Sequence, residues 1–284
     1  MRRFDARHII HKPQGDLFMR RILSFLLFTV VFSGCAENGP DPLDAAISGA
    51  HRDAKNVARD VYRHPGETLT FFGIKPDMEV LEILPGAGWY TEILAPYLRD
   101  DGLLAVASFG PDHSAEFLRN LHNGLVGKFD GDPENYGKVV VGVFQGESYL
   151  EGFEDESFDM VVTFRNTHNW IRFGGVEDVC QAMYRVLKPG GILGVVQHRA
   201  GAGTDATETA ERGYVPESYM IRLLEDTGFE LVDKSEINAN PKDTRDYPEG
   251  VWTLPPTYRL GDEDREKYAA IGESDRMTMK FVKL

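Results

Sequence analysis

The chain has 284 residues, of which 42% are hydrophobic and 27% charged, and its formal net charge at pH 7 is −14. This composition is typical of a globular protein with one large α/β domain or two small ones, and it excludes a collagen-like repeat, a disordered chain and a multi-span membrane protein. The acidic charge argues against nucleic acid as a partner, because such binding depends on basic groups that contact phosphates. Two cysteines cannot build a disulfide framework.

The N-terminus has the pattern of an export signal. Met-Arg-Arg at 19–21 precedes an apolar run at 22–32, and Ser-Gly-Cys follows at 33–35. A basic stretch, a short apolar segment and small residues at its end are typical of a secretory signal peptide. We therefore predict that residues 1–35 are a signal region, that translation starts at Met19 so that 1–18 are not translated, and that the protein is exported to the periplasm. The alternative is an uncleaved N-terminal anchor.

The cysteine that ends this region resembles the lipobox cysteine of bacterial lipoproteins, although Phe32 stands where Leu is usual. The resemblance implies that Cys35 carries lipid, becomes the first mature residue and anchors the protein to a membrane. Residues 36–45 hold Pro, Gly and Asp and are expected to form a linker. Residues 46–284 are then the folded domain.

Strands and helices are expected to alternate along this domain. The hydrophobic pattern predicts strands at 80–84, 103–108, 138–144, 158–164, 192–197, 229–237 and 277–284, and helices at 44–63, 91–99, 176–187 and 216–228. Such alternation favours a doubly wound α/β fold with a mostly parallel sheet covered on both faces. The proline-rich stretch 238–274 is expected to be an irregular excursion between the last two strands, not a second domain.

A glycine-rich turn follows the first predicted strand. Pro85, Gly86, Ala87 and Gly88 lie between strand 80–84 and the next helix. Glycines at such a turn let a ligand approach the main chain closely, near the N–H groups of the helix. Open α/β sheets bind ligands at this end of their strands. The turn therefore predicts a ligand site, although a dinucleotide pattern would need further glycines and a downstream acid.

Further segments stand in a fixed order behind this turn: Phe-Glu-Asp-Glu-Ser-Phe-Asp at 153–159, Lys-Pro-Gly-Gly at 188–191 and Asp-Thr-Gly-Phe at 226–229. With them the chain resembles the class I S-adenosylmethionine-dependent methyltransferases, and most closely an exported bacterial group of predicted methyltransferases. The residues similar to that group are His64-Pro65, Phe71 to Gly73, Pro85-Gly86, Gly88 to Glu92, Arg165-Asn166, His168 to Trp170 and His198-Arg199. The resemblance implies a seven-stranded sheet with an antiparallel last strand, expected at the edge, and S-adenosylmethionine as the cofactor.

The resemblance also implies roles for single residues. Gly86 and Gly88 would lie against the amino-acid moiety of the cofactor, Glu82 would help to hold that moiety, and Glu147 would lie near the adenine amine. The acid that ends the second strand in the family has no counterpart here, and Ser108 can donate only one hydrogen bond. Because of this departure, an exported non-catalytic binding or scaffold protein is the alternative function. Another nucleotide-utilising enzyme, with NAD or flavin, is a third.

Polar residues that follow two strands are the candidates for catalysis on a small-molecule acceptor. Arg165 begins a polar run that faces the expected cofactor, and within it His168 is the leading base because imidazole titrates near neutral pH. Asn166 would position the acceptor. His198 would share the base role or, with Arg199, bind an anionic acceptor. Alternatively, these residues only brace their loops. No two histidines share metal-ligand spacing with a carboxylate, so no metal is expected.

Two further groups are expected to be structural. His51, Arg52, Arg63 and His64 flank the predicted helix 44–63 and are expected to form a solvated face of it. Trp89 and Tyr90, which start the helix after the glycine turn, are expected in the core. The sequence identifies neither the acceptor nor the oligomeric state.

Overall fold

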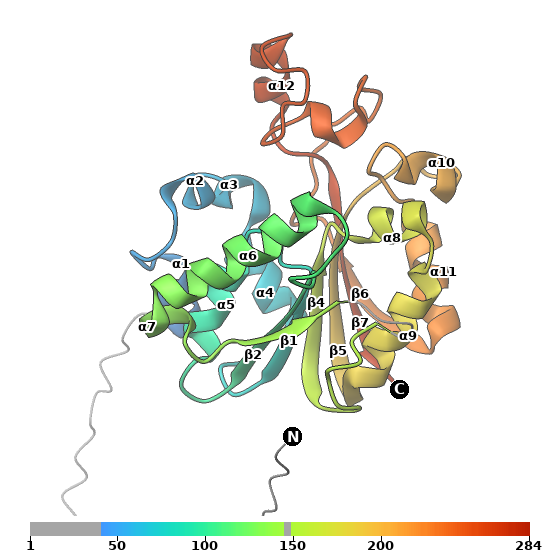
Figure 1. The fold of residues 1–284 in the computed structure, drawn as a ribbon. Helices are drawn as coiled ribbons and strands as arrows, with labels where there is room; N and C mark the ends of the chain where they lie inside the picture. The colour runs from blue at the N-terminus through green and yellow to red at the C-terminus, as the bar shows by residue number, and fades with distance from the viewer. Residues whose placement is uncertain (1–40, 145–148) are drawn as a thin grey trace, which may run out of the picture. The chain divides into compact units, whose positions relative to one another are not determined.

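Across the residues that the computed structural model describes, 41–144 and 149–284, seven strands form one sheet in the order β3-β2-β1-β4-β5-β7-β6 (Figure 1). The strands are β1 (Glu79–Ile83), β2 (Leu103–Ser108), β3 (Val140–Val143), β4 (Phe158–Phe164), β5 (Leu187–His198), β6 (Phe229–Ser235) and β7 (Arg276–Lys283). β1 to β5 pair in parallel, and β7 is antiparallel to both β5 and β6. The predicted fold class, a doubly wound and mostly parallel sheet with an antiparallel last strand, is confirmed.

The last strand does not lie at the edge, so that part of the prediction is wrong. β7 lies between β5 and β6, and β6 forms the edge. The side chains explain this order: Met277, Met279 and Phe281 of β7 are buried, whereas β6 has an exposed and largely polar sequence. A strand buried on both faces suits the interior of a sheet, and charged residues suit an edge because they oppose pairing with another chain.

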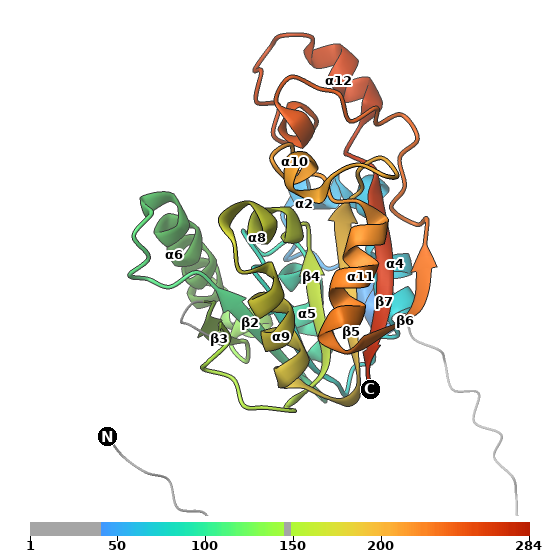
Figure 2. The same ribbon diagram turned by 90° about the vertical axis from the view of Figure 1, so that its right-hand side faces the viewer.

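Helices cover both faces of the sheet (Figures 1 and 2). They are α1 (Pro42–Ile47), α2 (Ala54–Val57), α3 (Asp60–Arg63), α4 (Pro65–Phe72), α5 (Thr91–Leu98), α6 (Glu116–Gly131), α7 (Pro133–Tyr136), α8 (Thr167–Phe173), α9 (Val176–Val186), α10 (Ala206–Ala210), α11 (Glu217–Thr227), the 3-10 turn η1 (Gly250–Thr253) and α12 (Arg265–Ile271). One core cluster joins the sheet to α4, α5 and α6, and the other joins it to α8, α9 and α11. Among the described residues, no helix has the length and apolar character that crossing a bilayer requires.

The alternation of side chains along β1 determines what faces each layer. Leu81 and Ile83 belong to the cluster under α9 and α11, and Val80 belongs to the cluster under α5. Because successive residues of a strand point to opposite faces, Glu82 lies on the same face as Val80. The strand therefore brings a carboxylate into this layer, next to the start of α5, where Thr91 hydrogen-bonds to it.

The N-terminal helical region differs from its prediction. Instead of one helix over 44–63, four short helices, α1 to α4, span Pro42–Phe72. Pro65 begins α4 rather than ending a helix, because proline fits the first helical position, where no intrahelical N–H bond is lost. His64, with φ of 41°, forms the break between α3 and α4.

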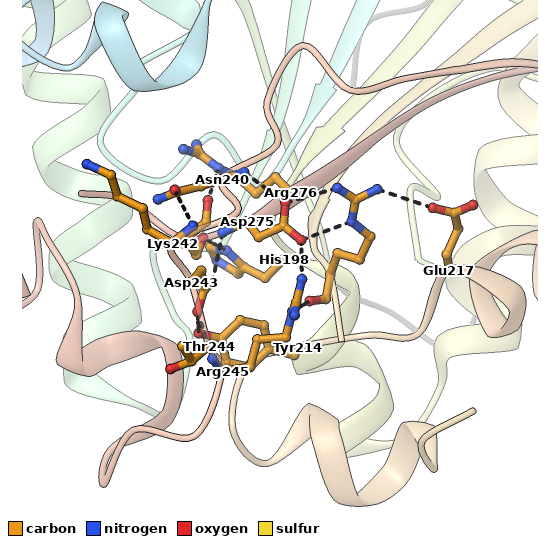
Figure 3. A network of polar contacts seen from close by, with 12 residues as sticks. His198, Tyr214, Glu217, Asn240, Lys242, Asp243, Thr244, Arg245, Asp275 and Arg276 are labelled. Carbon is orange, nitrogen blue, oxygen red and sulfur yellow. Dashed lines mark hydrogen bonds and ion pairs between the residues drawn. The ribbon is translucent and has the colours of Figure 1, made fainter. Parts of the chain in front are cut away.

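The segment between β6 and β7 lies above the carboxyl ends of the strands, as Figure 1 shows in orange and red. It contains η1 and α12, which the sequence did not predict. A polar network around Asp275 holds its two ends to β5 (Figure 3). Asp275 accepts hydrogen bonds from Arg199 at 3.0 Å, from Arg245 at 2.5 Å and from the main-chain N–H of Asn240 at 2.9 Å. The segment thereby covers the carboxyl ends of the strands.

Candidate active site

A cavity of about 350 Å³ lies at the carboxyl ends of β1, β4 and β5. Its walls come from four separate parts of the chain: the α3 region, the turn after β1, the ends of β4 and β5, and the segment between β6 and β7. Small-molecule sites commonly have volumes of about 300–1,000 Å³ and lie where parallel strands end in an open sheet. The cavity therefore has the size and the place expected of a ligand site in this fold.

Main chain is exposed to the cavity at the turn after β1. Gly86 lines the cavity with φ of +63°, and a Cβ atom built there would meet no atom within 4 Å. The open space beside Gly86 is therefore available to a ligand, and the left-handed conformation disfavours any larger residue. Pro85 also lines the cavity, whereas Gly88 is buried against Leu125 and Ala87 is exposed outside it.

Glu82 supplies a buried carboxylate to the same wall. It is 1% exposed, and the Thr91 hydroxyl donates a hydrogen bond to its Oε2 at 2.6 Å. Burial raises the pKa of Glu82 to about 7, and the Thr91 hydrogen bond opposes that rise. Near neutral pH this carboxyl group is thus close to half ionised, and a bound cation would draw it toward the charged form.

The end of β4 is tied to the end of β1. Asn166 Nδ2 donates hydrogen bonds to the main-chain oxygen of Ile83 at 3.0 Å and to Thr163 Oγ1 at 3.1 Å, and Asn166 is the residue before α8. The expected polar loop is therefore partly helix. Asn166 was expected either to position the acceptor or to brace its loop, and these contacts supply the bracing. Contact of Asn166 with an acceptor stays a prediction. Arg165 adopts φ of +65° and lines the cavity.

The buried His168 and the half-buried His198 lie side by side in the cavity wall, with ring centroids 5.7 Å apart. Burial lowers the pKa of His168 to about 4, and burial followed by the nearby His168 lowers the pKa of His198 well below its ordinary value. Gln197 Nε2 lies 3.2 Å from His168 Nδ1 and also donates to the Gly213 main-chain oxygen. His168 Nδ1 is then an acceptor, which leaves the ring proton on Nε2. His198 Nδ1 lies 2.5 Å from Ser274 Oγ. Both rings are neutral near pH 7, and a base role for either stays a prediction.

The α3 region contributes arginines instead of the solvated face expected from the sequence, so that expectation is wrong for Arg52 and Arg63. Both are buried, and Arg63 is 3% exposed. Arg63 Nε donates to Glu273 at 3.1 Å, and its guanidinium lies 4.6 Å from the centroid of the Trp89 ring. Glu273 comes from just before β7, so only the folded chain reveals the pairing. Arg52 instead pairs with Asp60 at 2.7 Å, outside the cavity.

Residues of the segment between β6 and β7 complete the cavity and were missed entirely. Trp252, Glu273 and Ser274 line it, and the Trp252 ring lies 5.8 Å from the His168 ring. Nothing in their local sequence distinguishes them from other surface residues. Trp89 and Tyr90 are buried in the core as predicted and also line the cavity, with Tyr90 stacked on Phe164 at 3.5 Å between centroids.

Of the two residues predicted for the adenosine half of a cofactor, the structure describes Ser108, which does not line this cavity. Ser108 is buried at the end of β2, where its main-chain oxygen accepts a hydrogen bond from Phe144 at 2.7 Å. Glu147 lies outside the described residues, as do Cys35 and the predicted signal region. Cofactor contacts by Ser108, Ala87, Gly88 and Glu147 stay predictions.

Comparison with known proteins gives a direct match for the central part of the chain. Residues 81–195 match the family model described as a methyltransferase domain. This matched segment of 115 of the 284 residues is similar to that domain. It contains Glu82, the glycine turn and the end of β4 with Arg165 and His168, whereas Arg63, His198 and Glu273 lie outside it.

Single proteins that are similar to this chain are also methyltransferases. A sterol 24-C-methyltransferase of Yarrowia lipolytica is 27% identical over 191 residues, which are 63% of this chain and 46% of that protein. The match thus spans about half the length of this curated relative. A SAM-dependent methyltransferase from Aquifex aeolicus has a similar structure, with a TM-score of 0.53 and 17% identity over 86% of this chain and 99% of that one.

A phosphoethanolamine N-methyltransferase from Haemonchus contortus, solved in complex with S-adenosyl-L-methionine, matches with a TM-score of 0.52 and 15% identity over 87% of this chain and 60% of that one. At such identities the structural matches establish the fold. Together with the family match, they support a class I methyltransferase and S-adenosylmethionine as its cofactor.

Proposed function

We propose that the protein transfers the methyl group of S-adenosylmethionine to a small-molecule acceptor bound in the cavity over β1 and β4. The observation that carries this proposal is the bare main chain at Gly86, which borders open space in a ligand-sized cavity inside the matched methyltransferase domain. S-adenosylmethionine, when bound, supplies an electrophilic methyl group on a sulfonium. The chain's own residues must bind, orient and shield the reactants.

Glu82 and the glycine turn fit the amino-acid moiety of this cofactor. An ammonium group beside Gly86 would favour the ionised form of Glu82, whose carboxylate Thr91 already holds in place. The stacked Tyr90 and Phe164 rings form a rigid apolar wall beside this position. The acceptor would lie toward His168 and Trp252, under the segment between β6 and β7, which shields that part of the cavity from water.

Isothermal titration of S-adenosylmethionine into the full chain tests the proposal. We expect saturable binding by the wild type and its loss in Gly86→Val, whose side chain would fill the open space. Gly203→Val is the matched control, because Gly203 also has positive φ and open space around it but lies on an exposed loop outside the cavity. The absence of wild-type binding at millimolar cofactor, or equal losses in both variants, would contradict the proposal.

A non-catalytic binding protein is the second candidate function. It is favoured by Ser108, which stands where the class I methyltransferases that this chain resembles carry an acid that binds the ribose. The same titration separates the two candidates when it is followed by detection of S-adenosylhomocysteine, because a binding protein would not form that product with any acceptor supplied.

We also propose that the chain belongs to the exported group named above and is a periplasmic lipoprotein anchored through Cys35, with residues 36–45 as its linker. The proposal is supported by the order of basic, apolar and small residues before Cys35. Mass spectrometry of the mature N-terminus would detect acyl chains on Cys35. An intact N-terminus at Met1 or Met19 would contradict export by this route.

A further inference from the structure

Positive charge is in excess around the cavity. Among the described residues, three arginines line it, Arg59, Arg63 and Arg165, against two carboxylates, Glu82 and Glu273. Glu273 is shared: it accepts hydrogen bonds from Arg59 at 2.7 Å and from Arg63 at 3.1 Å, and Arg276 lies 3.2 Å from it behind the wall. One carboxylate thus serves three guanidinium groups.

Two of these arginines keep unpaired donors. Arg63 Nη1 and Arg165 Nη1 are buried and have no hydrogen-bond partner. Within the described residues, no ion pair to Arg165 is found. Burial, and then the charge of Arg276, lower the pKa of Arg165 to about 10 although the charge of Glu273 opposes them, so Arg165 is still charged at neutral pH. A buried donor on a charged group is costly to leave unpaired, and an anion between the two arginines would remove that cost.

The cofactor does not remove this excess. S-adenosylmethionine carries a sulfonium and an ammonium group against one carboxylate, so its binding adds a positive charge to the cavity. Even with Glu82 fully ionised, the lining arginines outnumber the lining carboxylates among the described residues, so the excess persists. A neutral or cationic acceptor would leave this charge unbalanced, whereas an anionic acceptor would balance it.

Arg199, which the sequence offered for an anionic acceptor, is not available for it. Its guanidinium is held by Asp275 at 3.0 Å and by Glu236 at 2.7 Å, and it does not line the cavity. We propose that the methyl acceptor carries a carboxylate or phosphate group, which Arg63 and Arg165 bind through their unpaired Nη1 atoms. This inference rests on the proposed function and gives it a substrate class.

Anion binding by the full chain tests this directly and needs no cofactor. Sodium phosphate and sodium acetate are titrated in separate calorimetric experiments, with sodium chloride holding the ionic strength constant. We expect saturable binding of at least one anion by the wild type and a loss of roughly tenfold or more in affinity for Arg165→Gln, because a charged hydrogen bond is removed. No saturable binding of either anion would overturn the proposal.

Two variants separate loss of the anion site from unfolding and from a change in net charge. Arg165→Gln breaks no ion pair, so its fold should persist, and a circular dichroism melt verifies this. Arg222→Gln is the control, because Arg222 is exposed on α11 away from the cavity and its loss removes the same charge. Equal losses in the two variants would also overturn the proposal, since they would reflect net charge alone.

The carboxylate of the cofactor is the competing occupant of the arginine pair. We expect anion binding to persist when S-adenosylhomocysteine saturates the protein, and S-adenosylmethionine to bind Arg165→Gln within about twofold of the wild type. If S-adenosylhomocysteine abolishes anion binding, or if the variant loses cofactor and anion affinity together, the arginines serve the cofactor and the proposal fails. Failure of the wild type to bind any cofactor would instead refute the proposed function, while the anion titration still decides this inference.

Discussion

Replacement of Glu82 by Gln tests whether the cavity wall contains a carboxyl group with a pKa near 7. Glutamine has nearly the same shape, and its carbonyl oxygen can still accept the hydrogen bond from the Thr91 hydroxyl. The substitution therefore removes the charge and leaves the packing of this 1% exposed side chain almost unchanged.

Its magnitude follows from the pKa. Folding raises the pKa of Glu82 from 4.5 to about 7, so the folded chain binds this proton more tightly than the unfolded chain does. The contribution to stability is therefore full below pH 4.5 and is lost as the pH rises to about 7. At 1.36 kcal/mol per pH unit the loss is about 3 kcal/mol. Glutamine does not titrate, so Glu82→Gln escapes it.

Urea unfolding, monitored by tryptophan fluorescence at about pH 5 and pH 8.5, measures the effect. We expect the free energy of unfolding of Glu82→Gln minus that of the wild type to be about 2–3 kcal/mol larger at pH 8.5 than at pH 5, so the variant gains stability relative to the wild type at the higher pH. Glu230→Gln, at an exposed position on the edge strand β6, is the matched control and should show no such change. A difference that does not vary with pH would refute a raised pKa for Glu82.

Three further predictions concern Glu273, Asp275 and His168. Burial raises the pKa of Glu273, but Arg63 and two neighbouring arginines outweigh it and lower that pKa to about 2, so its contribution to stability is full above pH 4.5 and is lost as the pH falls toward 2. Glu273→Gln should cost about 3–5 kcal/mol in urea unfolding at neutral pH, because it leaves buried arginines uncompensated; a change below 1 kcal/mol would contradict this. Asp275→Asn should speed proteolytic cleavage between β6 and β7 without altering the melting of the sheet, and unchanged cleavage would show that the network does not hold this segment. The ring protons of His168, assigned by NMR with His168→Gln, should keep constant chemical shifts from about pH 8 to pH 5, because its pKa lies near 4; a midpoint near 6.5 would contradict its burial.

Local patterns predicted the sheet well, and α5, α9 and α11 begin and end within one residue of the predicted 91–99, 176–187 and 216–228, whereas the N-terminal helix was predicted poorly. β2 and β4 are found at the predicted 103–108 and 158–164, because apolar runs bounded by turn residues determine buried strands. The glycine turn was also readable, since its positive φ values require glycine. The helix expected at 44–63 failed because Pro65 and a left-handed His64 are compatible with either an end or a start, and tertiary contacts decide which.

Charge pairing across the chain was beyond such patterns. Arg63 and Glu273 are separated by 210 residues, and neither lies in an apolar or periodic context that marks it as buried. Arg199 shows the reverse error, because a basic residue at the end of β5 looked available for a ligand, yet Asp275 and Glu236 neutralise it. Whether an arginine is free depends on partners that the linear sequence does not bring together.

The division of the cavity between matched and unmatched residues indicates where its specificity lies. Glu82, Gly86 and Arg165 belong to the part that matches the methyltransferase family, whereas Arg63 and Trp252 come from segments before and after it. A family model captures what many proteins share, and under the proposed function Glu82 and Gly86 of that shared part bind the cofactor. The acceptor side is built from Arg165 together with α3 and the segment between β6 and β7, and these last two lie outside the matched residues. Arg63 lines the same cavity as Arg165 but lies outside the matched residues, so the proposed anion site joins a wall inside the match to one outside it.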